Sequence, residues 1–532
     1  MQFESATSRF FGAGALALAL ALCLCAGPAA AADALRWFDA DRPSHRATQA
    51  VELLADAASQ GLEPQDYAAD ALRQAVARAA QGPPWGAAAI ERLDQALTTA
   101  MERYLKDLHE GRVDPRQIGN GYALPPRDAF DAAATLKAAL AAHRLVEAAH
   151  EAAPQLPQYE RLRQALARYR ARVDDPVWRQ PLPPLPAGPR GGAGVLQPGQ
   201  AYAGLALLAR RLAAGGDRAP QAFVPALYEG PLVAAVEAFQ LRHGLVADGV
   251  VGRATLAQLR VTPAERVRQI ELALERLRWT PLMQGPRMIV INIPEFVLRA
   301  YDVRDGRIHV QLRMKVIVGQ ALDKRTPLFD ADLRAIEFSP YWNVPPSIAR
   351  AELVPELRRH PEDFEREGFE FVAPDGRVDT TLSAANLAAL SAGRLRIRQR
   401  PGPRNALGDI KFVFPNRDNI YLHHTPATQL FDRGRRDFSH GCIRVEQPVA
   451  LAEFVLQGMP EWTEDRIRQA MGQGESKTLR LPDPVRVLIA YGTALVVDGR
   501  VHFFDDIYGQ DRLLDAALRR NTENRGQTPL YR

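Results

Sequence analysis

The sequence lacks a set of paired cysteines, a concentrated basic stripe and a second long apolar run after its N-terminal one. Without a further apolar run, we expect no additional membrane-spanning helix. Lys and Arg are spread along the 532 residues and the net charge is only +5, so we expect no nucleic-acid partner. At 47% hydrophobic and 24% charged residues, the composition is that of a folded globular protein.

The N-terminus has the pattern of a secretory signal peptide. Arg9 precedes an apolar run over residues 10–26, and small residues follow up to Asp33. We predict cleavage near Ala30 or Ala32, which makes residues 1–32 the signal and the protein exported and soluble afterwards. The alternative is an uncleaved membrane anchor.

Cysteine is scarce, because only Cys23, Cys25 and Cys442 occur in the chain. The first two lie in the predicted signal, so one cysteine remains after cleavage. In an oxidising compartment cysteines are mostly paired in structural disulfides, and a lone thiol therefore indicates a chemical role.

The chain is too long for one core, and its patterns change several times. We predict a multidomain α+β protein with an N-terminal helical scaffold, a small three-helix module, and a mostly-β catalytic domain that carries a cap insertion. The predicted divisions are 33–195 (scaffold), 196–262 (three-helix module), 263–287 (connecting helix), 288–472 (catalytic domain, with the cap at about 345–403) and 473–532 (C-terminal strands).

Two local signals support these divisions. Residues 179–200 are dense in Pro and Gly and predict a linker. Thr262, Pro263 and Glu265 form a capping-box pattern with Pro at the first helical position, which predicts a helix start.

The candidate active site is Ser439-His440-Gly441-Cys442. A thiol attacks well only as thiolate, and a free cysteine has a pKa of about 8.5, so the neighbouring imidazole of His440 is the candidate base. Backbone N–H groups at Gly441 and Cys442 are candidates for stabilising an oxyanion during acyl transfer. Arg444 suits a substrate carboxylate.

Two other interpretations of these residues stay open. Cys442 could be a buried structural cysteine with His440 as a polar neighbour. Alternatively, His423, His424, His440 and Cys442 could be zinc ligands, although no carboxylate–histidine spacing of a familiar zinc enzyme occurs here. We therefore predict no metal and no cofactor.

The chain resembles two known families. Residues 202–259, with Phe239-Gln240, Gly244-Leu245 and Asp248-Gly249, resemble the small peptidoglycan-binding domain of wall enzymes. His423-x-Thr-Pro, followed by Ser439-His-Gly-Cys-Ile-Arg444, resembles the active-site pattern of L,D-transpeptidases with a YkuD-type catalytic domain. The layout is similar to the large YcbB-type members, and further matching stretches are 341–346, 403–408 and 505–511.

The resemblance implies a periplasmic enzyme that forms 3→3 cross-links between peptidoglycan stem peptides through a thioester on Cys442. It implies His440 as base, and His423, Gly441 and Ser439 as support for the loop or the oxyanion. Arg444, Trp342 and Tyr341 are then the candidate contacts of the donor stem. Glycan and other cell-wall synthesis proteins are candidate partners, and carbapenems are candidate inhibitors.

Other functions of the same residues remain open. If water attacks the thioester, the enzyme is an L,D-carboxypeptidase or an endopeptidase. A zinc-dependent amidase and a non-catalytic wall-binding protein are further alternatives.

Overall fold

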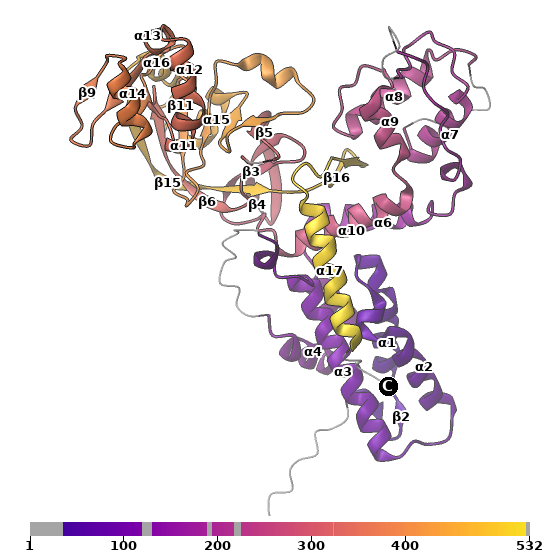
Figure 1. The fold of residues 1–532 in the computed structure, drawn as a ribbon. Coiled ribbons are helices and arrows are strands. Elements are labelled where there is room, and N and C mark those ends of the chain that lie inside the picture. Colours follow the sequence, from indigo (N-terminus) through magenta and orange to yellow (C-terminus); the bar gives the residue numbers. More distant parts are fainter. Residues whose placement is uncertain (1–35, 120–129, 189–193, 218–224, 323, 528–532) are drawn as a thin grey trace, which may run out of the picture.

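The computed structural model describes residues 36–119, 130–188, 194–217, 225–322 and 324–527. The predicted signal peptide, with Cys23 and Cys25, lies outside these residues. A helical domain forms one end of the molecule, and the sheet-containing part and the small module branch from its other end to opposite sides (Figure 1). Among the described residues, no helix has the length and apolar character needed to cross a membrane.

The helical domain is built from amphipathic helices around one core. In its longest helix, Leu93, Leu97, Tyr104 and Leu108 recur at helical spacing and are fully or almost fully buried. Its helices are α1 (His45–Ala55), α2 (Ala69–Gln81), α3 (Ala87–Glu110), α4 (Ala132–Ala141), α5 (Leu145–Ala152) and α6 (Pro157–Arg170), and a short hairpin, β1 (Phe38–Asp39) and β2 (Arg42–Pro43), precedes them.

The small module consists of α7 (Leu205–Gly215), α8 (Pro231–Arg242) and α9 (Arg253–Arg260). The buried amide of Gln240 joins its parts. The amide nitrogen donates to Asp248, to the carbonyl of Val250 and to Thr255, and the amide oxygen accepts from the N–H of Gly249. A buried amide with all its hydrogen bonds satisfied fixes a short turn well, which explains why this Gln precedes the Asp-Gly turn.

The Pro-rich stretch 179–200 is not a free linker. Leu182 and Leu196 are buried in the core of the small module, and Leu196 pairs with Val251 in an isolated β-bridge. The module therefore begins near Val177, about twenty residues before the predicted boundary at 196. Proline excludes helix from such a stretch but does not prevent an extended chain from packing.

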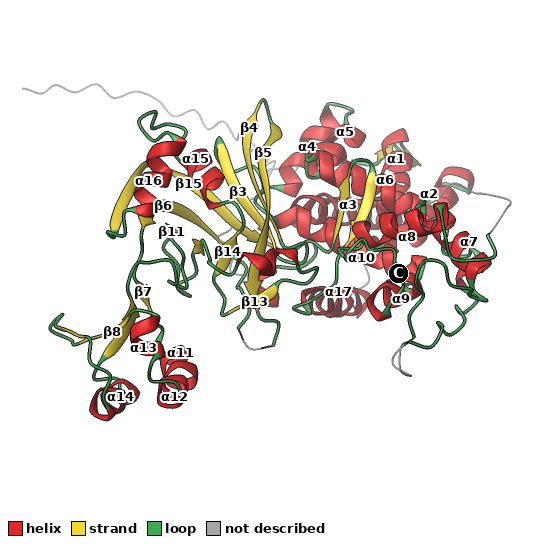
Figure 2. Ribbon diagram, turned by 90° about the horizontal axis from the view of Figure 1, so that it is seen from above, coloured by secondary structure: helices red, strands yellow, loops and turns green. Residues whose placement is uncertain are grey.

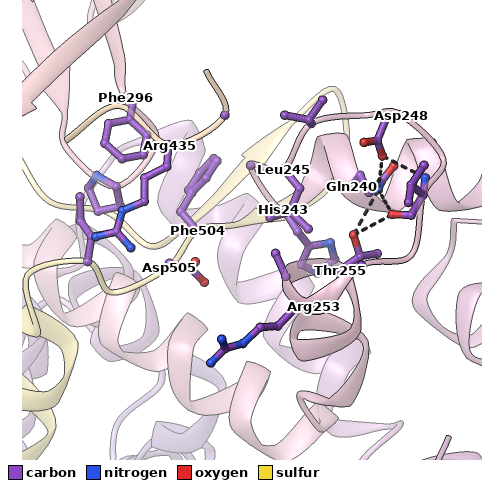
Figure 3. Close-up of a pocket in the computed structure, with 18 residues that line it drawn as sticks. Gln240, His243, Leu245, Asp248, Arg253, Thr255, Phe296, Arg435, Phe504 and Asp505 are labelled. Atoms are coloured by element: carbon purple, nitrogen blue, oxygen red, sulfur yellow. Dashed lines mark hydrogen bonds between the residues drawn. The ribbon is translucent and has the colours of Figure 1, made fainter. Parts of the chain in front are cut away.

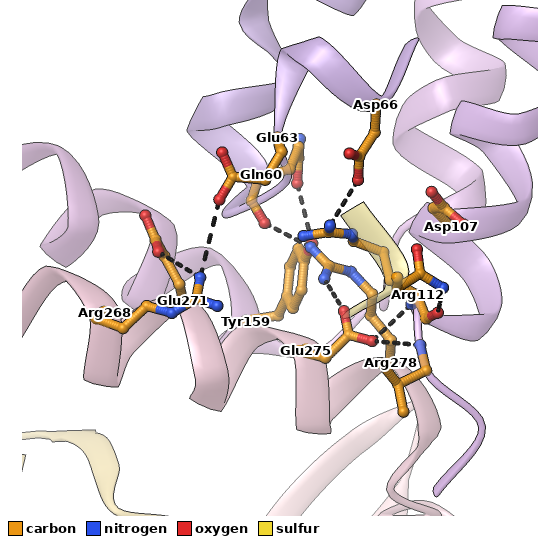
Figure 4. Close-up of polar contacts among 12 residues, drawn as sticks. Gln60, Glu63, Asp66, Asp107, Arg112, Tyr159, Arg268, Glu271, Glu275 and Arg278 are labelled. Carbon is orange, nitrogen blue, oxygen red and sulfur yellow. Dashed lines mark hydrogen bonds and ion pairs between the residues drawn. The ribbon is translucent and has the colours of Figure 1, made fainter. Parts of the chain in front are cut away.

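Helix α10 (Pro263–Trp279) connects the parts of the molecule. It begins at the predicted capping box, in which Thr262 and Glu265 bond to each other's backbone N–H. Ile270, Ala273 and Leu274 of α10 belong to the core of the helical domain. At its C-terminal end, buried Glu275 accepts hydrogen bonds from Arg278 and from the backbone N–H of Arg112 (Figure 4). These contacts explain why α10 is part of the scaffold rather than a free connection.

The domain predicted to be catalytic contains one large sheet, with the strand order β13-β5-β14-β12-β11-β6-β15-β3-β4. Because β4 also pairs with β5, the sheet closes on itself. Helices α15 (Pro448–Val455) and α16 (Glu464–Gly472) contribute to its core. The strands are β3 (Arg287–Asn292), β4 (Val297–Arg304), β5 (Arg307–Gly319), β6 (Asp330–Phe338), β11 (Ile410–Val413), β12 (Leu422–His423), β13 (Asp437–Ser439), β14 (Ile443–Val445) and β15 (Lys477–Ala490).

The insertion predicted as a cap forms a separate unit beside the sheet (Figure 2). It has its own buried core and its own sheet, with the order β7-β10-β8-β9. Its elements are β7 (Trp342–Asn343), α11 (Pro346–Ile348), a π-helical turn (Ala349–Leu353), α12 (Val354–Arg359), α13 (Asp363–Arg366), β8 (Phe369–Val372), β9 (Val378–Asp379), α14 (Ala384–Ser391) and β10 (Arg396–Gln399).

The chain enters and leaves the cap at one buried asparagine. The Asn405 side chain donates to the carbonyls of Pro340, before the cap, and Arg400, after it. Ser339 has a positive φ of 46° and ends β6 there. The chain therefore turns out of the main sheet between β6 and β7, and the apolar stretch 336–343 is divided between two sheets instead of forming one strand.

The C-terminal region is only partly strand. The hairpin of β16 (Ala494–Val497) and β17 (Arg500–Phe503) packs into the core of the helical domain. Residues Gln510–Gln527 then form helix α17, which runs along the helical domain (Figure 1). The prediction of strands throughout 473–532 is wrong for this segment. Leu514 and Leu518 lie on its buried face at helical spacing.

Candidate active site

The loop His440-Gly441-Cys442 joins two short strands of the main sheet. β13 ends at Ser439 and pairs with β5, and β14 begins at Ile443 and lies between β5 and β12. Gly441 has a φ of +120°, a conformation that residues with a side chain rarely adopt. The sheet therefore holds both ends of a sharp turn that only glycine forms without strain.

Hydrogen bonds fix the backbone of this turn. Buried Ser439 donates through Oγ to the carbonyl of Cys442 at 2.5 Å and accepts from the N–H of Gly441 at 3.2 Å. Thr326 donates to the carbonyl of Gly441 at 2.7 Å and accepts from the N–H of Gly319 at 2.9 Å. Tyr508 in turn donates to the carbonyl of Gly319.

These bonds change the predicted oxyanion site. The N–H of Gly441 already donates to Ser439 and is not available for a developing negative charge. The N–H of Cys442 has no hydrogen-bond partner within the described part of the chain. The amide of Cys442 is therefore the better candidate donor to an oxyanion, and Ser439 acts by shaping the loop.

The sulfur of Cys442 is half-buried and lies 3.6 Å from the carbonyl oxygen of Asn419. Burial raises the pKa of this thiol, and hydrogen bonds from the N–H and O–H of Tyr421 oppose that rise, as do the charges of Lys411 and Arg444. Burial dominates, so the thiol is protonated at neutral pH. Its proton must therefore leave as the sulfur attacks, which requires a base nearby.

Tyr421 is a site residue that the sequence reasoning missed. Its hydroxyl lies beside the sulfur, and the ammonium of Lys411 lies 4.5 Å from the centre of its ring. Tyr421 and His423 are two residues apart near one strand, and their rings contact edge to face at 5.7 Å. Residues two positions apart on a strand have side chains on the same face of the sheet. The spacing between Tyr421 and His423 could therefore have indicated Tyr421 from the sequence.

His440 is exposed, and its Nε2 faces Glu352 of the cap. Its Nε2 lies 2.9 Å from both carboxylate oxygens of Glu352. Among the described residues no hydrogen bond joins His440 to Cys442. Catalytic hydrogen bonds are often long in the absence of substrate, so the adjacency of His440 and Cys442 in the loop keeps His440 a candidate base.

His423 lies on β12 and is buried. Its Nδ1 lies 2.5 Å from the carbonyl oxygen of His424, and the carbonyl of Leu407 is a second partner. Burial, with the charge of Arg444, lowers the pKa of His423 to about 3. A neutral ring bonded to backbone carbonyls fits a role in supporting the loop.

His424 lies beside a different carboxylate. Its Nδ1 is 2.7 Å from Oδ1 of Asp409, and its backbone N–H donates to the carbonyl of Ile410. A Cβ on Gly408, whose φ is +63°, would collide with the His424 ring. Within the described ranges, no group of three or more His, Cys, Asp or Glu residues is placed to hold a metal ion.

The predicted substrate contacts fall in two places. Arg444 lies on β14, opposite His423 in the parallel pair, and the N–H of its Nε has no partner within the described chain. Trp342 packs on the core of the cap, and the guanidinium of Arg398 lies 4.0 Å from the ring centre of Tyr341. Arg444 is thus part of the Cys442 site, whereas the contacts of Trp342 and Tyr341 lie within the cap.

A second cleft, of about 500 Å³, lies where the small module meets the catalytic domain (Figure 3). His243, Leu245 and Arg253 of the module face Phe296 and Arg435 of the catalytic domain across it. Phe504, after β17, also lines the cleft.

Family models match three parts of the chain. An L,D-transpeptidase catalytic domain (YkuD) matches residues 286–463, a scaffold domain matches 29–166, and a model described as "Putative peptidoglycan binding domain" matches 215–259. These matches agree with the predicted family and with the predicted combination of helical, peptidoglycan-binding and β-rich catalytic parts.

One relative and two solved structures are also similar. A Haemophilus influenzae protein named "Putative L,D-transpeptidase" is 31% identical over 249 residues, which are 47% of this chain. The chain spans about half of that relative's length (49%). An L,D-transpeptidase structure from Xylanimonas cellulosilytica is 18% identical, with a TM-score of 0.17, and covers 58% of this chain and 100% of its own. One from Stackebrandtia nassauensis is 13% identical, with a TM-score of 0.22, and covers 55% and 94%. The TM-scores of these two structures are too low to support a conclusion.

Proposed function

We propose that this chain, which combines a scaffold domain, a peptidoglycan-binding domain and an L,D-transpeptidase catalytic domain, forms 3→3 cross-links between peptidoglycan stem peptides. The observation that supports this most directly is the Cys442 loop, in which a half-buried thiol sits on a glycine turn fixed by Ser439 and Thr326. The protein acts outside the cytoplasm after removal of residues 1–32.

The first half-reaction forms a thioester. The sulfur of Cys442 attacks the carbonyl carbon of the third stem residue while its proton passes to His440. The N–H of Cys442 stabilises the negative charge on the carbonyl oxygen. The carbon–nitrogen bond then breaks, and His440 returns the proton to the leaving amine of the terminal D-alanine.

The second half-reaction transfers the acyl group. The side-chain amine of a diamino acid on a neighbouring stem attacks the thioester, and His440 accepts its proton. The carbon–sulfur bond breaks, an amide forms, and the thiol of Cys442 regains a proton. Arg444, beside the sulfur and incompletely hydrogen-bonded, suits a carboxylate of the donor stem.

Muropeptide analysis tests the proposal. Purified protein incubated with tetrapeptide-rich peptidoglycan should release D-alanine and produce 3→3 dimers, and Cys442→Ala should produce neither. Tripeptides without dimers would instead identify an L,D-carboxypeptidase. Activity that stops in chelator and survives Cys442→Ala would identify a metal-dependent amidase.

Carbapenem labelling is a second test of the same thiol. A carbapenem should add its mass to Cys442 in the intact protein and stop cross-linking. Unmodified Cys442 after complete loss of activity would contradict the thioester route.

A further inference from the structure

Four arginines line a small cavity at the base of the small module. Arg211 of α7 and Arg242 of α8 come from the module, Arg266 comes from α10, and Arg172 follows α6 of the helical domain. Helices α6 and α10 lie beside each other below the module in Figure 1. The cavity therefore lies where the module meets the scaffold, and no Asp or Glu is among the described residues that line it.

The buried charges around this cavity do not balance. Arg211, Arg242 and Arg266 are each at most 6% exposed. Arg242 forms a buried ion pair with Asp217, which accepts from two of its nitrogens. Within the described chain, neither Arg211 nor Arg266 pairs with a carboxylate. Buried charges are normally paired, because an unpaired charge loses its hydration without compensation.

The partners of these two guanidinium groups are neutral. Arg211 donates to three backbone carbonyls, and Arg266 donates to two glutamine side chains. The guanidinium of Arg211 also lies over the ring of Trp178, and that of Arg266 lies 4.4 Å from the ring centre of Phe503. Carbonyls, amides and ring faces stabilise a cation locally, but they carry no net charge. The carboxylate of Asp217 therefore faces three buried guanidinium groups.

The pKa values of neighbouring groups indicate the same positive potential. Burial lowers the pKa of Arg266 to about 10, and the charge of Arg242 adds to this effect. Burial also lowers the pKa of His243, which lines the cavity, well below its usual value, and the charges of Arg242 and Arg266 contribute. Arg266 is still charged at neutral pH, so an anion in the cavity would be stabilised.

A further donor and the size of the cavity indicate which anion fits. The indole N–H of Trp178, which also lines the cavity, is buried and has no partner among the described residues. Such a donor commonly marks the place of an ion or a water. The cavity has a volume of about 20 Å³, and a water molecule needs about 10–15 Å³ of such space. One ion little larger than water fits, which favours chloride and excludes phosphate, sulfate and a peptide carboxylate.

We propose that this cavity binds a single chloride ion, which joins the small module to the scaffold. The ion faces the guanidinium groups of Arg211 and Arg266 and accepts from the indole N–H of Trp178. It supplies the negative charge that the neutral partners of these arginines lack, and it stabilises the orientation of the module. The inference goes beyond the proposed function and does not depend on it, because neither chloride binding nor unfolding involves peptidoglycan.

A bromide soak of crystals of the full chain tests the site directly. Bromide replaces chloride and is located by its anomalous scattering. We expect a bromide peak in the cavity between α7 and α10. Bromide peaks at other places without one in the cavity, or no peaks at all, would overturn the inference.

Thermal unfolding followed by circular dichroism tests the site in solution. Gluconate is too large for the cavity, so its replacement by chloride at a constant ionic strength of about 0.15 M should raise the midpoint of the wild-type protein by about 3 °C or more. Arg266→Met removes one of the unpaired charges and should abolish this shift, and Trp178→Phe should reduce it. An Arg266→Met midpoint that rises as much as that of the wild type would contradict the proposed site.

The matched control is Arg210→Met. Arg210 precedes Arg211 on α7, but it is exposed and donates to Gln180. This variant should keep the wild-type shift, and loss of the shift here would indicate general surface screening and refute a specific site. Each variant is compared with itself in two salts, so a lower stability of the variant does not affect the result, and the bromide measurement needs no variant.

Discussion

Acid should destabilise the catalytic domain through His423. The ring is buried on β12 and bonded to backbone carbonyls, and its pKa is lowered to about 3. In the unfolded chain the same group has its ordinary pKa of about 6.5. Because the folded pKa is lowered, the stabilisation is complete above the unfolded pKa and is lost as pH falls from 6.5 towards 3.

The size of the effect follows from the two pKa values. Each unit of pKa difference is worth about 1.4 kcal/mol, so His423 should cost about 2 kcal/mol of folding free energy between pH 7 and pH 5. The loss should approach about 4–5 kcal/mol near pH 3. For a domain whose total stability is about 5–15 kcal/mol, this is a large share.

His423→Asn isolates this contribution, because an Asn amide can still donate to the carbonyl of His424 but does not titrate. Urea unfolding followed by the fluorescence of Trp462, which stacks on Phe338 in the catalytic core, reports this domain. The variant should be less stable than wild type at pH 7, and the difference should shrink by about 2 kcal/mol at pH 5. His309→Asn, at an exposed position of β5, is the control. A pH-independent difference for His423→Asn would refute the reasoning.

Three further predictions follow from single contacts. Gly441→Ala places a Cβ at a φ of +120° and should slow acylation of Cys442 by a carbapenem about tenfold or more. The control is Gly472→Ala, whose Cβ would lie in open space and should leave the acylation rate unchanged. Equal acylation rates for the two variants would contradict the strained turn. Tyr421→Phe removes a donor to the sulfur and should slow Cys442 alkylation at pH 8 about tenfold; an unchanged rate would show that the hydroxyl does not stabilise the thiolate. Glu275→Gln leaves a buried guanidinium without its carboxylate and should cost about 3–5 kcal/mol, seen as a lower midpoint of thermal unfolding of the helical domain. An unchanged midpoint would mean that the remaining partners of the Arg278 guanidinium are enough to stabilise it in the folded protein.

Much of the fold could be predicted because its signals are local. The capping box at Thr262 and Glu265 starts α10 where expected, since both side chains bond within one helical turn. Residues 288–292 and 309–318 lie in β3 and β5 of the main sheet, because alternating or continuous apolar residues indicate burial directly. In each case the residues that make the pattern also make the contacts.

Other elements depend on partners that are distant in the sequence. Helix α17 is strongly polar, and Arg525 on it pairs with Asp107 of α3, a contact between residues 418 positions apart. Leu182 is buried in the small module although its neighbours are prolines. Neither position carries a local pattern that reveals its partner.

The residues of the candidate active site also divide into those with a local sequence signal and those without one. Cys442 and His440 could be proposed from the sequence because a lone thiol and an imidazole two residues away are recognisable without any structure. Tyr421 reaches the sulfur only after β12 and β14 pair in parallel, and Glu352 reaches His440 only after the cap folds as a separate unit. The candidate nucleophile and base are thus close in sequence, whereas the groups beside them come from parts of the chain that are distant in sequence.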